Sequence, residues 1–471
     1  MKEQDFEEHL PVKYKLGYSS ARLGNDIMSG IGFAALTFFY NDVLDLRADL
    51  AGWAWMIFAI WNALNDPLFG IIEDKTRTSI GRRIPYLRYG SPLYVLVFLL
   101  CWFPLTDNTN QIGLFFNFLL VLFALDTMFT ITGLITYSLP AEMTLTQKAR
   151  ANIIMWGTLF GVVGTIISYV LPVFLLTESS PGAVSALFQP MMFIISIACG
   201  VMIFVGSFFI KENDYTRREE PLGFLQSVVE TAKNKPFLIF EVSKVCMTIM
   251  STTITTSLTY YVKYVLELGG GIMSALPIGS VFLVAVVFVI IYNVLIPRRG
   301  AKKILIFGLI WAGGAFILLF FTGMNLVTAI VSFCILGVGF SATLIAAPVL
   351  FSDTIDHDEI RTGKRRETTY SGMEALITKP AISVANWLFL LVINAFGYSS
   401  TTTVPAPIEV KTGILFAICI VSAIFVLIAA AVLCFYPLDG PNWKEQKQKL
   451  QIIHDQKERE FLASIGKDLK R

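Results

Sequence analysis

Apolar segments long enough to cross a lipid bilayer follow one another along almost the whole chain, and they constrain its fold more than any other feature. A bilayer core about 30 Å thick requires about 20 mostly apolar residues per helix. Hydrophobic residues make up 55% of the 471 residues and charged residues only 15%, which excludes a soluble domain with a charged surface. We therefore predict an all-α membrane protein with twelve transmembrane helices, at residues 18–44, 50–72, 85–105, 111–138, 151–176, 187–210, 237–265, 272–296, 302–322, 326–351, 368–396 and 410–437.

The distribution of lysine and arginine predicts the orientation. Five alternate loops carry most of these residues, whereas the opposite loops carry only Arg47, Lys263 and Lys411. Short cytoplasmic loops are enriched in basic residues, so we expect both chain termini in the cytoplasm and the protein in the plasma membrane. The net charge is +2 and the basic residues form no single patch, so nucleic acid is not an expected partner.

The longest internal polar stretch, at residues 211–236, divides the chain into two halves of six spans. A basic turn recurs in the second loop of each half, as GRR in the first and PRRGAKK in the second. Transporters built from two parallel six-helix repeats hold their substrate between the repeats. We predict a cytoplasmic N-terminal tail at 1–17, an N-terminal bundle at 18–210, a central cytoplasmic linker at 211–236, a C-terminal bundle at 237–437 and a cytoplasmic tail at 438–471, which we expect to be a solvated or interfacial helix.

Ionisable residues inside the predicted spans mark the candidate site, because each costs roughly 2.5 to 3.5 kcal/mol at the centre of a membrane helix. Arg22 and Asp26 lie four residues apart in the first span, hence on one helix face. The other spans contribute Asp66, Asp126, Glu241, Lys244, Glu374 and Lys379. The alternative is that some of these residues form buried ion pairs that fix helix packing. For Asp26, Asp66 and Lys379 we favour a functional role.

Asn62, Asn65 and Asp66 bring three oxygen-bearing side chains together in the second span. Asn62 and Asp66 are four residues apart and share a helix face, with Asn65 alongside. Oxygen ligands of this kind, with a nearby hydroxyl group, suit a small hard cation such as Na⁺. The same carboxylate equally suits a proton carrier. The sequence therefore predicts a coupling-ion site for Na⁺ or H⁺, and no other metal or cofactor.

The run FSDTIDHDEIRTGKRRE, residues 351–367, is rich in both acids and bases and is predicted to lie in the cytoplasm. Its closely spaced Asp, Glu and His residues suit a metal site, but the interleaved arginines and lysine favour a network of salt bridges. We predict a cytoplasmic gate in which the basic loops pair with acidic residues when the inner side is closed. Its residues are Asp74, Arg82, Arg83, Asp353, Asp356 and Arg365.

Two long stretches, GNDIMSGIGFAALTFFYNDVLDL (24–46) and IWNALNDPLFGIIEDKTRTSIGRRIPYL (60–87), resemble the glycoside-pentoside-hexuronide:cation symporters, the melibiose-permease-like branch of the major facilitator superfamily. The later stretches YSLPAEMT (137–144), SDTIDHDE (352–359) and ETTYSGMEALITKP (367–380) are similar to that family in order and spacing. The resemblance covers essentially the whole membrane region and implies the major facilitator fold.

The resemblance also implies roles for individual residues. Asp26 matches the family's first-helix acid, which binds substrate hydroxyl groups in sugar-transporting members. Asp66 matches the second acid of the W-D-x-x-x-D-P cation motif, and Thr130 a fourth-helix hydroxyl of that site. Lys379 matches the eleventh-helix lysine, which bridges toward the cation or the substrate.

Three positions depart from the family pattern. Asn62 replaces the first acid of the cation motif and removes one of its two negative charges. Gly133 stands where galactoside-specific members have a second sugar-binding acid, and Thr158 where they have an arginine. These departures argue against a galactoside pocket.

We predict a secondary transporter that couples movement of a sugar or glycoside to Na⁺ or H⁺ by alternating access. The predicted residues for the substrate are Arg22, Asp26, Asp126, Tyr137 and Lys379, and those for the cation are Asn62, Asn65, Asp66 and Thr130.

Two other functions are weighed beside this one. The related lysophospholipid carriers share the eleventh-helix lysine, so a lipid or amphiphile carrier is the first alternative. Those carriers generally lack an acid like Asp26, which favours a polar, hydroxyl-bearing solute here. A non-transporting membrane scaffold is the second. The sequence contains no nucleophile with a nearby base and no ATP-binding loop, so an enzyme is not predicted. We expect a monomer whose partners are its solute, a monovalent cation and membrane lipid.

Overall fold

The computed structural model describes residues 10–76, 78–81, 83–144, 147–177, 184–210, 231–363, 366–450, 452–453 and 456. Their regular elements are all helical. The first half contains α1 (Val12–Phe38), the π-helical segment η1 (Phe39–Val43), α2 (Ala48–Lys75), α3 (Ile84–Trp102), α4 (Gln111–Met143), α5 (Gln147–Leu176) and α6 (Phe188–Gly206). The second half contains α8 (Lys235–Tyr260), η3 (Tyr261–Val265), α9 (Ile272–Arg299), α10 (Ala301–Thr322), α11 (Leu326–Thr362), α12 (Glu367–Ala395), α13 (Ile408–Leu415), η4 (Phe416–Val421) and α14 (Ser422–Cys434).

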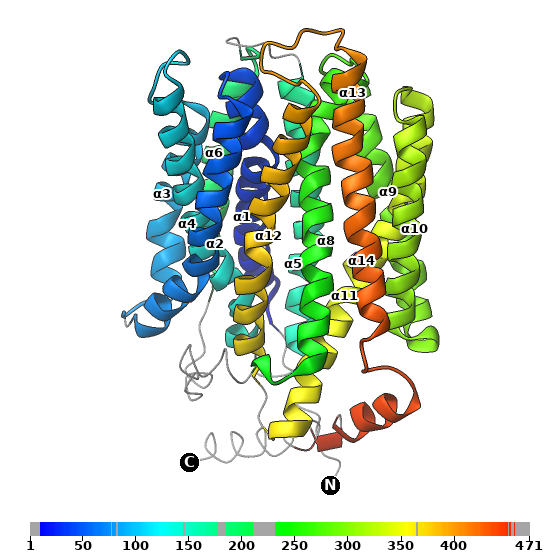
Figure 1. Ribbon diagram of the computed structural model, residues 1–471. Helices are drawn as coiled ribbons and strands as arrows, with labels where there is room; N and C mark the ends of the chain where they lie inside the picture. Colours follow the sequence, from blue (N-terminus) through cyan, green and yellow to red (C-terminus); the bar gives the residue numbers. More distant parts are fainter. Residues whose placement is uncertain are drawn as a thin grey trace.

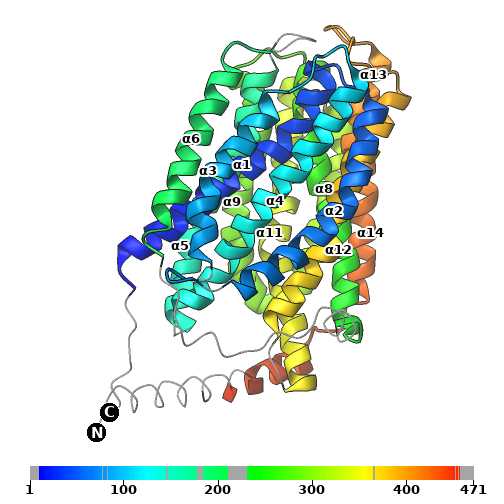
Figure 2. The same cartoon turned by 90° about the vertical axis from the view of Figure 1, so that its left-hand side faces the viewer.

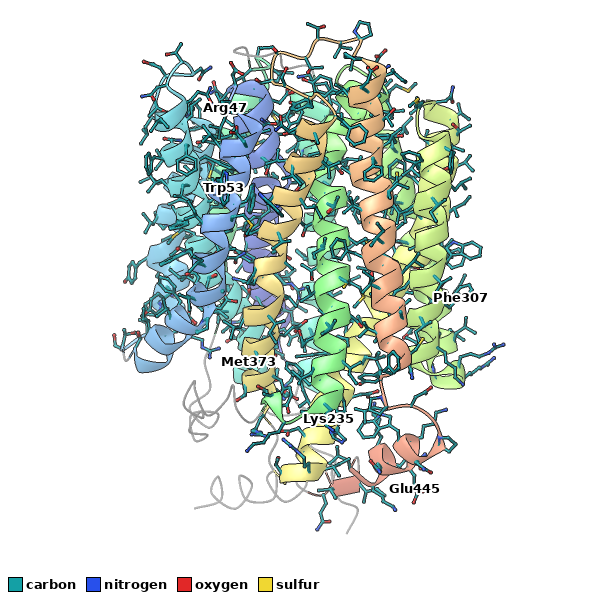
Figure 3. The ribbon with its side chains drawn as sticks, viewed as in Figure 1. Arg47, Trp53, Lys235, Phe307, Met373 and Glu445 are labelled. Atoms are coloured by element: carbon teal, nitrogen blue, oxygen red, sulfur yellow. The ribbon has the colours of Figure 1, made fainter. Side chains whose placement is uncertain are left out.

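Ten helices within the described residues are long and apolar enough to cross a membrane. The helices α1 and α2 are of similar length, 27 and 28 residues, but Arg22, Asp26 and Asp66 interrupt their apolar sequence. Large apolar side chains cover the outside of the bundle, such as Trp53 on α2 and Phe307 on α10, which are 59% and 50% exposed (Figure 3). Such an exterior suits lipid. The predicted all-α membrane fold is confirmed, and the count of twelve spans stays a prediction.

The helices of the two halves pack mainly within their own half, and a few pairs join them. In the first half α1 packs against α5 and α6, and in the second half α10 packs against α11 and α14. Between the halves, α2 lies along α12 and α5 lies against α9 (Figures 1 and 2). The contact of α2 with α12 brings residues of both halves close together.

Asparagine side chains begin several of these helices, and small residues let them approach. The side-chain oxygen of Asn110 accepts a hydrogen bond from the backbone N–H of Gly113 at the start of α4, and Asn325 caps α11 in the same way. Where α10 crosses α11, a Cβ atom at Gly339 would lie 2.6 Å from the carbonyl oxygen of Gly308. Close approach of membrane helices requires such small residues.

The helix α11 is longer than predicted. The sequence suggested a span ending near residue 351 and a cytoplasmic loop after it, but the helix continues to Thr362 and extends past its neighbours (Figure 2). The reason is local: no glycine or proline interrupts the chain between Pro348 and Gly363, and Gly363 ends the helix with φ of 72°. The acidic residues of this run therefore lie on a helix and not in a loop.

The first helix of each half ends in the same way, which reveals a structural repeat. Both α1 and α8 pass into a π-helical segment, followed by V-L-D-L at 43–46 and V-L-E-L at 265–268. The N–H of Leu44 bonds the carbonyl of Phe39 at 2.9 Å, and the N–H of Leu266 bonds that of Tyr261 at 3.0 Å. In each half the acid that follows adopts positive φ, 65° at residue 45 and 54° at residue 267. The two halves therefore share this local structural repeat.

The start of the C-terminal tail packs against the extended end of α11. Residues 441–450 are helical and lie across the lower end of the bundle in Figure 1. Trp443 and Leu450 are buried, and the Lys447 ammonium lies 2.5 Å from the Asp353 carboxylate. This part of the tail is thus a docked helix, whereas the sequence suggested a solvated or interfacial one.

Candidate functional site

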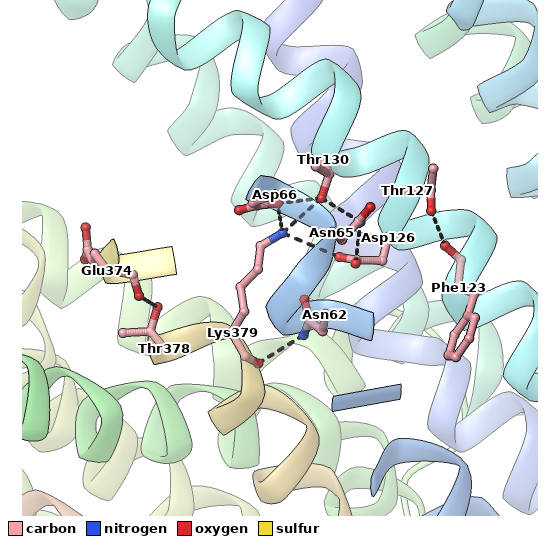
Figure 4. A network of polar contacts seen from close by, with 10 residues as sticks. All are labelled: Asn62, Asn65, Asp66, Phe123, Asp126, Thr127, Thr130, Glu374, Thr378 and Lys379. Carbon is pink, nitrogen blue, oxygen red and sulfur yellow. Dashed lines mark hydrogen bonds and ion pairs between the residues drawn. The ribbon is translucent and has the colours of Figure 1, made fainter. Parts of the chain in front are cut away.

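A buried network of charged and polar side chains joins the two halves at the contact between α2 and α12 (Figure 4). The Lys379 ammonium donates to Asp66 Oδ1 and, at 3.0 Å, to Thr130 Oγ1, and lies 3.7 Å from Asp126 Oδ1. Thr130 donates to Asp66 at 2.7 Å. Asn65 Nδ2 donates to Asp126 at 2.7 Å and to Thr130 at 2.9 Å. We call these five residues the central network.

Simple helical spacing brings the central network together on each helix. Asp126 and Thr130 are four residues apart on α4 and therefore face the same way. Asn65 and Asp66 are neighbours on α2, which packs against both α4 and α12. Lys379 reaches them from α12 in the other half of the chain. The backbone of that residue is also held, because Asn62 Nδ2 donates to its carbonyl oxygen at 3.0 Å.

The charges of the central network do not balance. Asp66 and Asp126 are both buried, and one ammonium group lies between them. With both acids ionised, the cluster carries one net negative charge in a low-dielectric site, which a monovalent cation or a proton would neutralise. Asp126, predicted as a substrate residue, thus lies in the central network as a second acid beside Asp66, and its role stays a prediction.

Several oxygen atoms of this region have spare hydrogen-bonding capacity. Among the described residues, nothing donates a hydrogen bond to the buried side-chain oxygens of Asn62 and Asn65, or to Asp126 Oδ1. Carbonyl and carboxylate oxygens of this kind are the ligands that Na⁺ and other hard cations take. The residues present therefore fit a small cation as well as a proton.

The second predicted group, Arg22 and Asp26, lies on α1 facing α5. Arg22 Nε is 3.5 Å from Asp26 Oδ2, and both side chains are about a third exposed, at 32% and 28%. This exposure distinguishes them from the central network and leaves both groups accessible to a solute. Ser168 of α5 donates to the backbone carbonyl of Asp26 at 3.1 Å and holds α1 in place.

Gly161 on α5 makes the space for this pair. A Cβ atom there would lie 3.1 Å from Asp26 Oδ2 and 3.4 Å from Arg22 Nε. We expect Gly161→Val to displace both side chains and to raise the solute concentration for half-maximal uptake at least about tenfold, which corresponds to 1.4 kcal/mol of binding. Uptake kinetics in proteoliposomes measure this change. Gly279→Val is the matched control, because a Cβ at that helical glycine meets nothing within 4 Å; equal effects of both substitutions would contradict the role of Gly161.

Several predicted substrate and gate residues lie partly or wholly outside the described part of the structure. Tyr137 lies on α4 and Asp74 on α2, but their side chains are outside the described part of the structure, as are Arg82 and Arg365 entirely. Arg83 is buried.

One acid of the predicted cytoplasmic gate pairs with the C-terminal tail. Asp353 pairs with Lys447 of the tail, and the nearby Asp358 pairs with Arg361 at 2.9 Å and Arg366 at 2.5 Å. Asp356 is buried. The pairing of the basic loops with Asp74, Asp353 or Asp356 stays a prediction.

A third cluster, at the predicted outer end of the bundle, was missed by the sequence analysis. Asp42 of η1 is fully buried and accepts hydrogen bonds from Lys263, Tyr264 and Tyr398. We call these four residues the outer cluster. Lys263 was assigned to an outer loop, yet it is only 6% exposed and pairs across the two halves. The sequence did contain a signal for this cluster: Asp42 lies near the end of the first predicted span, and Lys263 lies at the matching place in the seventh.

Comparisons with known proteins agree with this architecture. A glucuronide carrier protein homolog of Escherichia coli is 24% identical, over 93% of this chain and 97% of its own length. A putative glycoside/cation symporter of the same organism is 23% identical, over 88% of this chain and 89% of its own. The crystal structure of a D-xylose-proton symporter superposes with a TM-score of 0.67 at 12% identity, covering 90% of this chain and 97% of that one, and so shares the fold. The family model for MFS/sugar transport proteins matches residues 17–440, and this chain therefore belongs to that family, as its resemblance to the glycoside-pentoside-hexuronide symporters predicted.

Proposed function

We propose that this multi-pass membrane protein moves a sugar or glycoside together with Na⁺ or H⁺ by alternating access. The observation that carries the proposal is the position of Lys379, a base of the second half held between two buried acids of the first half. A cation that binds these acids competes with the ammonium group and so changes a contact between the halves. Alternating access requires such a contact.

The coupling follows from electrostatics. The arriving cation compensates the net negative charge of the central network and so weakens the attraction of Asp66 and Asp126 for Lys379. The halves then move more easily relative to each other at the contact of α2 with α12. Because coupling between two ligands is reciprocal, a solute that binds better after the cation also strengthens the binding of the cation.

The solute is expected to bind at Arg22 and Asp26. An aspartate accepts hydrogen bonds from sugar hydroxyl groups, and a guanidinium donates to hydroxyl or carboxylate oxygens. The names of the two bacterial relatives, a glucuronide carrier homolog and a glycoside/cation symporter, support a solute of this chemistry. The membership of a sugar-transport family supports it further.

The decisive experiment is uptake into proteoliposomes under an imposed Na⁺ or proton gradient. The labelled solutes are a methyl glucuronide, a methyl galactoside, xylose and a lysophospholipid. We expect one of the sugars to accumulate above its external concentration with one gradient. Accumulation of the lysophospholipid alone, or of no solute with either gradient, would contradict sugar symport.

Asp66→Asn tests the coupling. We expect accumulation to fall to the equilibrium level while exchange of solute across the membrane continues, since the variant loses the charge that binds the cation. Asp49→Asn is the matched control, because Asp49 lies on the same helix but pairs with Arg47 at an exposed position. Full gradient-driven accumulation by Asp66→Asn would exclude Asp66 as the coupling residue.

A further inference from the structure

A buried glutamate of α8 has no hydrogen-bonding partner among the described residues. The Glu241 side chain is 1% exposed, and neither of its carboxyl oxygens accepts a hydrogen bond there. An ionised carboxylate in such a place requires a cation or several donors, because its transfer from water is strongly unfavourable. An ion pair was one interpretation of Glu241 from the sequence. In the structure, the nearby Lys244 pairs with a different acid.

That other acid is Glu374 of α12. The rings of Phe237 and Tyr370 pack edge to face with centroids 4.9 Å apart, where α8 and α12 begin. The two helices start at the same end of the bundle, as Lys235 and Met373 show in Figure 3. One turn further on, Glu241 and Glu374 therefore lie at the same level. The Lys244 ammonium lies 3.5 Å from Glu374 Oε1, which confirms this register.

No other charged group in the described structure forms an ion pair with Glu241. On α14, which packs against α8 at this level through Ser243 and the carbonyl of Ala429, residues 422–434 include no acid, lysine or arginine. The acids of α11 are held near its far end, where Asp353 pairs with Lys447 and Asp358 with two arginines. On α1, Arg22 and Asp26 pair with each other, and the other charged residue of α12 near this level, Lys379, is bound to the central network.

The cluster formed by Glu241, Lys244 and Glu374 therefore contains two acids and one base. If both acids were ionised, Glu241, the more deeply buried of the two, would carry a negative charge with no partner. A single proton on Glu241 removes that charge, while Lys244 and Glu374 neutralise each other. Neutralisation by a proton is how buried acids avoid the cost of burial.

We propose that Glu241 is a proton-binding site of this transporter, protonated in the conformation described and deprotonated when Lys244 turns from Glu374 to Glu241. The inference rests on the proposed cation-coupled transport and names the proton as a coupling ion, bound apart from the central network. In this step the O–H bond of the Glu241 carboxylic acid breaks and water takes up the proton. The resulting carboxylate then pairs with the Lys244 ammonium, and no electrons are transferred.

The pair of Lys244 and Glu374 is suited to act as the trigger. Its side chains are 32% and 22% exposed, so a solute can reach them, whereas Glu241 lies buried behind. Its separation of 3.5 Å is longer than the usual 2.7 to 2.9 Å of a charge-assisted hydrogen bond. A solute hydroxyl group that bridges Lys244 and Glu374 keeps the pair together and so keeps the proton on Glu241. After the solute leaves, Lys244 can turn to Glu241, and its positive charge then favours loss of the proton to water.

Infrared difference spectroscopy of the purified protein in lipid nanodiscs detects this proton without any solute. The C=O stretch of a protonated carboxyl group shifts when H₂O is replaced by D₂O. We expect such a band in the wild type and its loss in Glu241→Gln. We also expect its loss in Glu374→Gln, which retains Glu241 but leaves Lys244 free to pair with it. This second variant gives the same readout if Glu241→Gln fails to fold.

The control and the transport measurement separate the possible outcomes. Glu267→Gln removes an acid that pairs with Lys411 at the other end of the same helical unit, and it should leave the band unchanged. A band that persists in Glu241→Gln, or is absent from the wild type, would overturn the proton site. In transport, Glu241→Gln should keep solute exchange and lose proton-driven accumulation. Wild-type accumulation driven by Na⁺ alone would also overturn the proton site while leaving symport intact, whereas no accumulation with either gradient would contradict the proposed function itself.

Discussion

Replacing Lys379 with glutamine should destabilise the protein by about 3–5 kcal/mol in the absence of a coupling ion, the cost of removing one partner of a buried ion pair. The substitution leaves Asp66 and Asp126 facing each other with no ammonium between them. Two like charges close together in a buried site repel each other strongly. Thermal unfolding of the protein in nanodiscs, followed by tryptophan fluorescence, measures the loss.

The same variant should reveal the coupling ion. With the ammonium gone, a cation no longer competes for the two acids, so we expect Na⁺ or acid pH to stabilise Lys379→Gln more than it stabilises the wild type. The ion that does so is the one that binds the central network. In the double variant with Asp66→Asn, the loss should be smaller than the sum of the single losses, because the two residues interact directly. A Lys379→Gln protein as stable as the wild type, with no response to either ion, would show that the network does not bind cations.

The second large effect is expected at the outer cluster. Asp42→Asn leaves the Lys263 ammonium buried without a counter-ion, which again costs about 3–5 kcal/mol. Because Asp42 and Lys263 belong to different halves, the substitution should favour conformations in which the outer end is open. Thr256 lies buried on α8 and donates to Asn386 of α12, to which Thr37 of α1 in the other half also donates, so it reports on this opening. In a cysteine-free background, Thr256→Cys should react faster with a membrane-impermeant thiol reagent when Asp42 is replaced.

Two controls define the role of the outer cluster. Asp42→Asn with Lys263→Met should recover much of the lost stability, since a buried ion pair can often be replaced by uncharged groups at little cost. Glu267→Gln breaks the partly exposed pair with Lys411 at the same end, where a single bridge contributes about 0–1 kcal/mol, and should leave labelling unchanged. Equal labelling rates in the wild type and Asp42→Asn would exclude the outer cluster as a closure of the outer end.

Much of the fold was predictable because it depends on local properties of the chain. Apolar segments of sufficient length form helices in lipid, where each backbone group must bond within its own segment. The predicted starts of the eighth and tenth spans, residues 272 and 326, coincide with those of α9 and α11. The error at the end of α11 came from a change of polarity at residue 353 with no helix-breaking residue until Gly363. A solvated end and a membrane-embedded middle can belong to one helix.

The candidate site was predictable only in part. Asp66, Thr130 and Lys379 were named together on the family resemblance, and the structure brings them into contact. Asp126 was assigned to the solute, because nothing in the sequence shows that α4 turns it toward α2. Glu241 shows the same difficulty: the sequence names Glu241, Lys244 and Glu374 without indicating which of them meet, and the structure places Lys244 3.5 Å from Glu374 of a neighbouring helix.

The sequence by itself determined that this chain spans a membrane as helices, that it contains two similar halves and that a few charged residues lie where charge is expensive. Each of these properties is set by residues close together in the chain. Only the tertiary structure decided which charges meet, because Asp66 and Lys379 are 313 positions apart and Asp42 and Lys263 are 221 apart. The free energy of a buried charge depends on whether an opposite charge lies within a few ångströms, and that distance is set by the packing of helices from different halves.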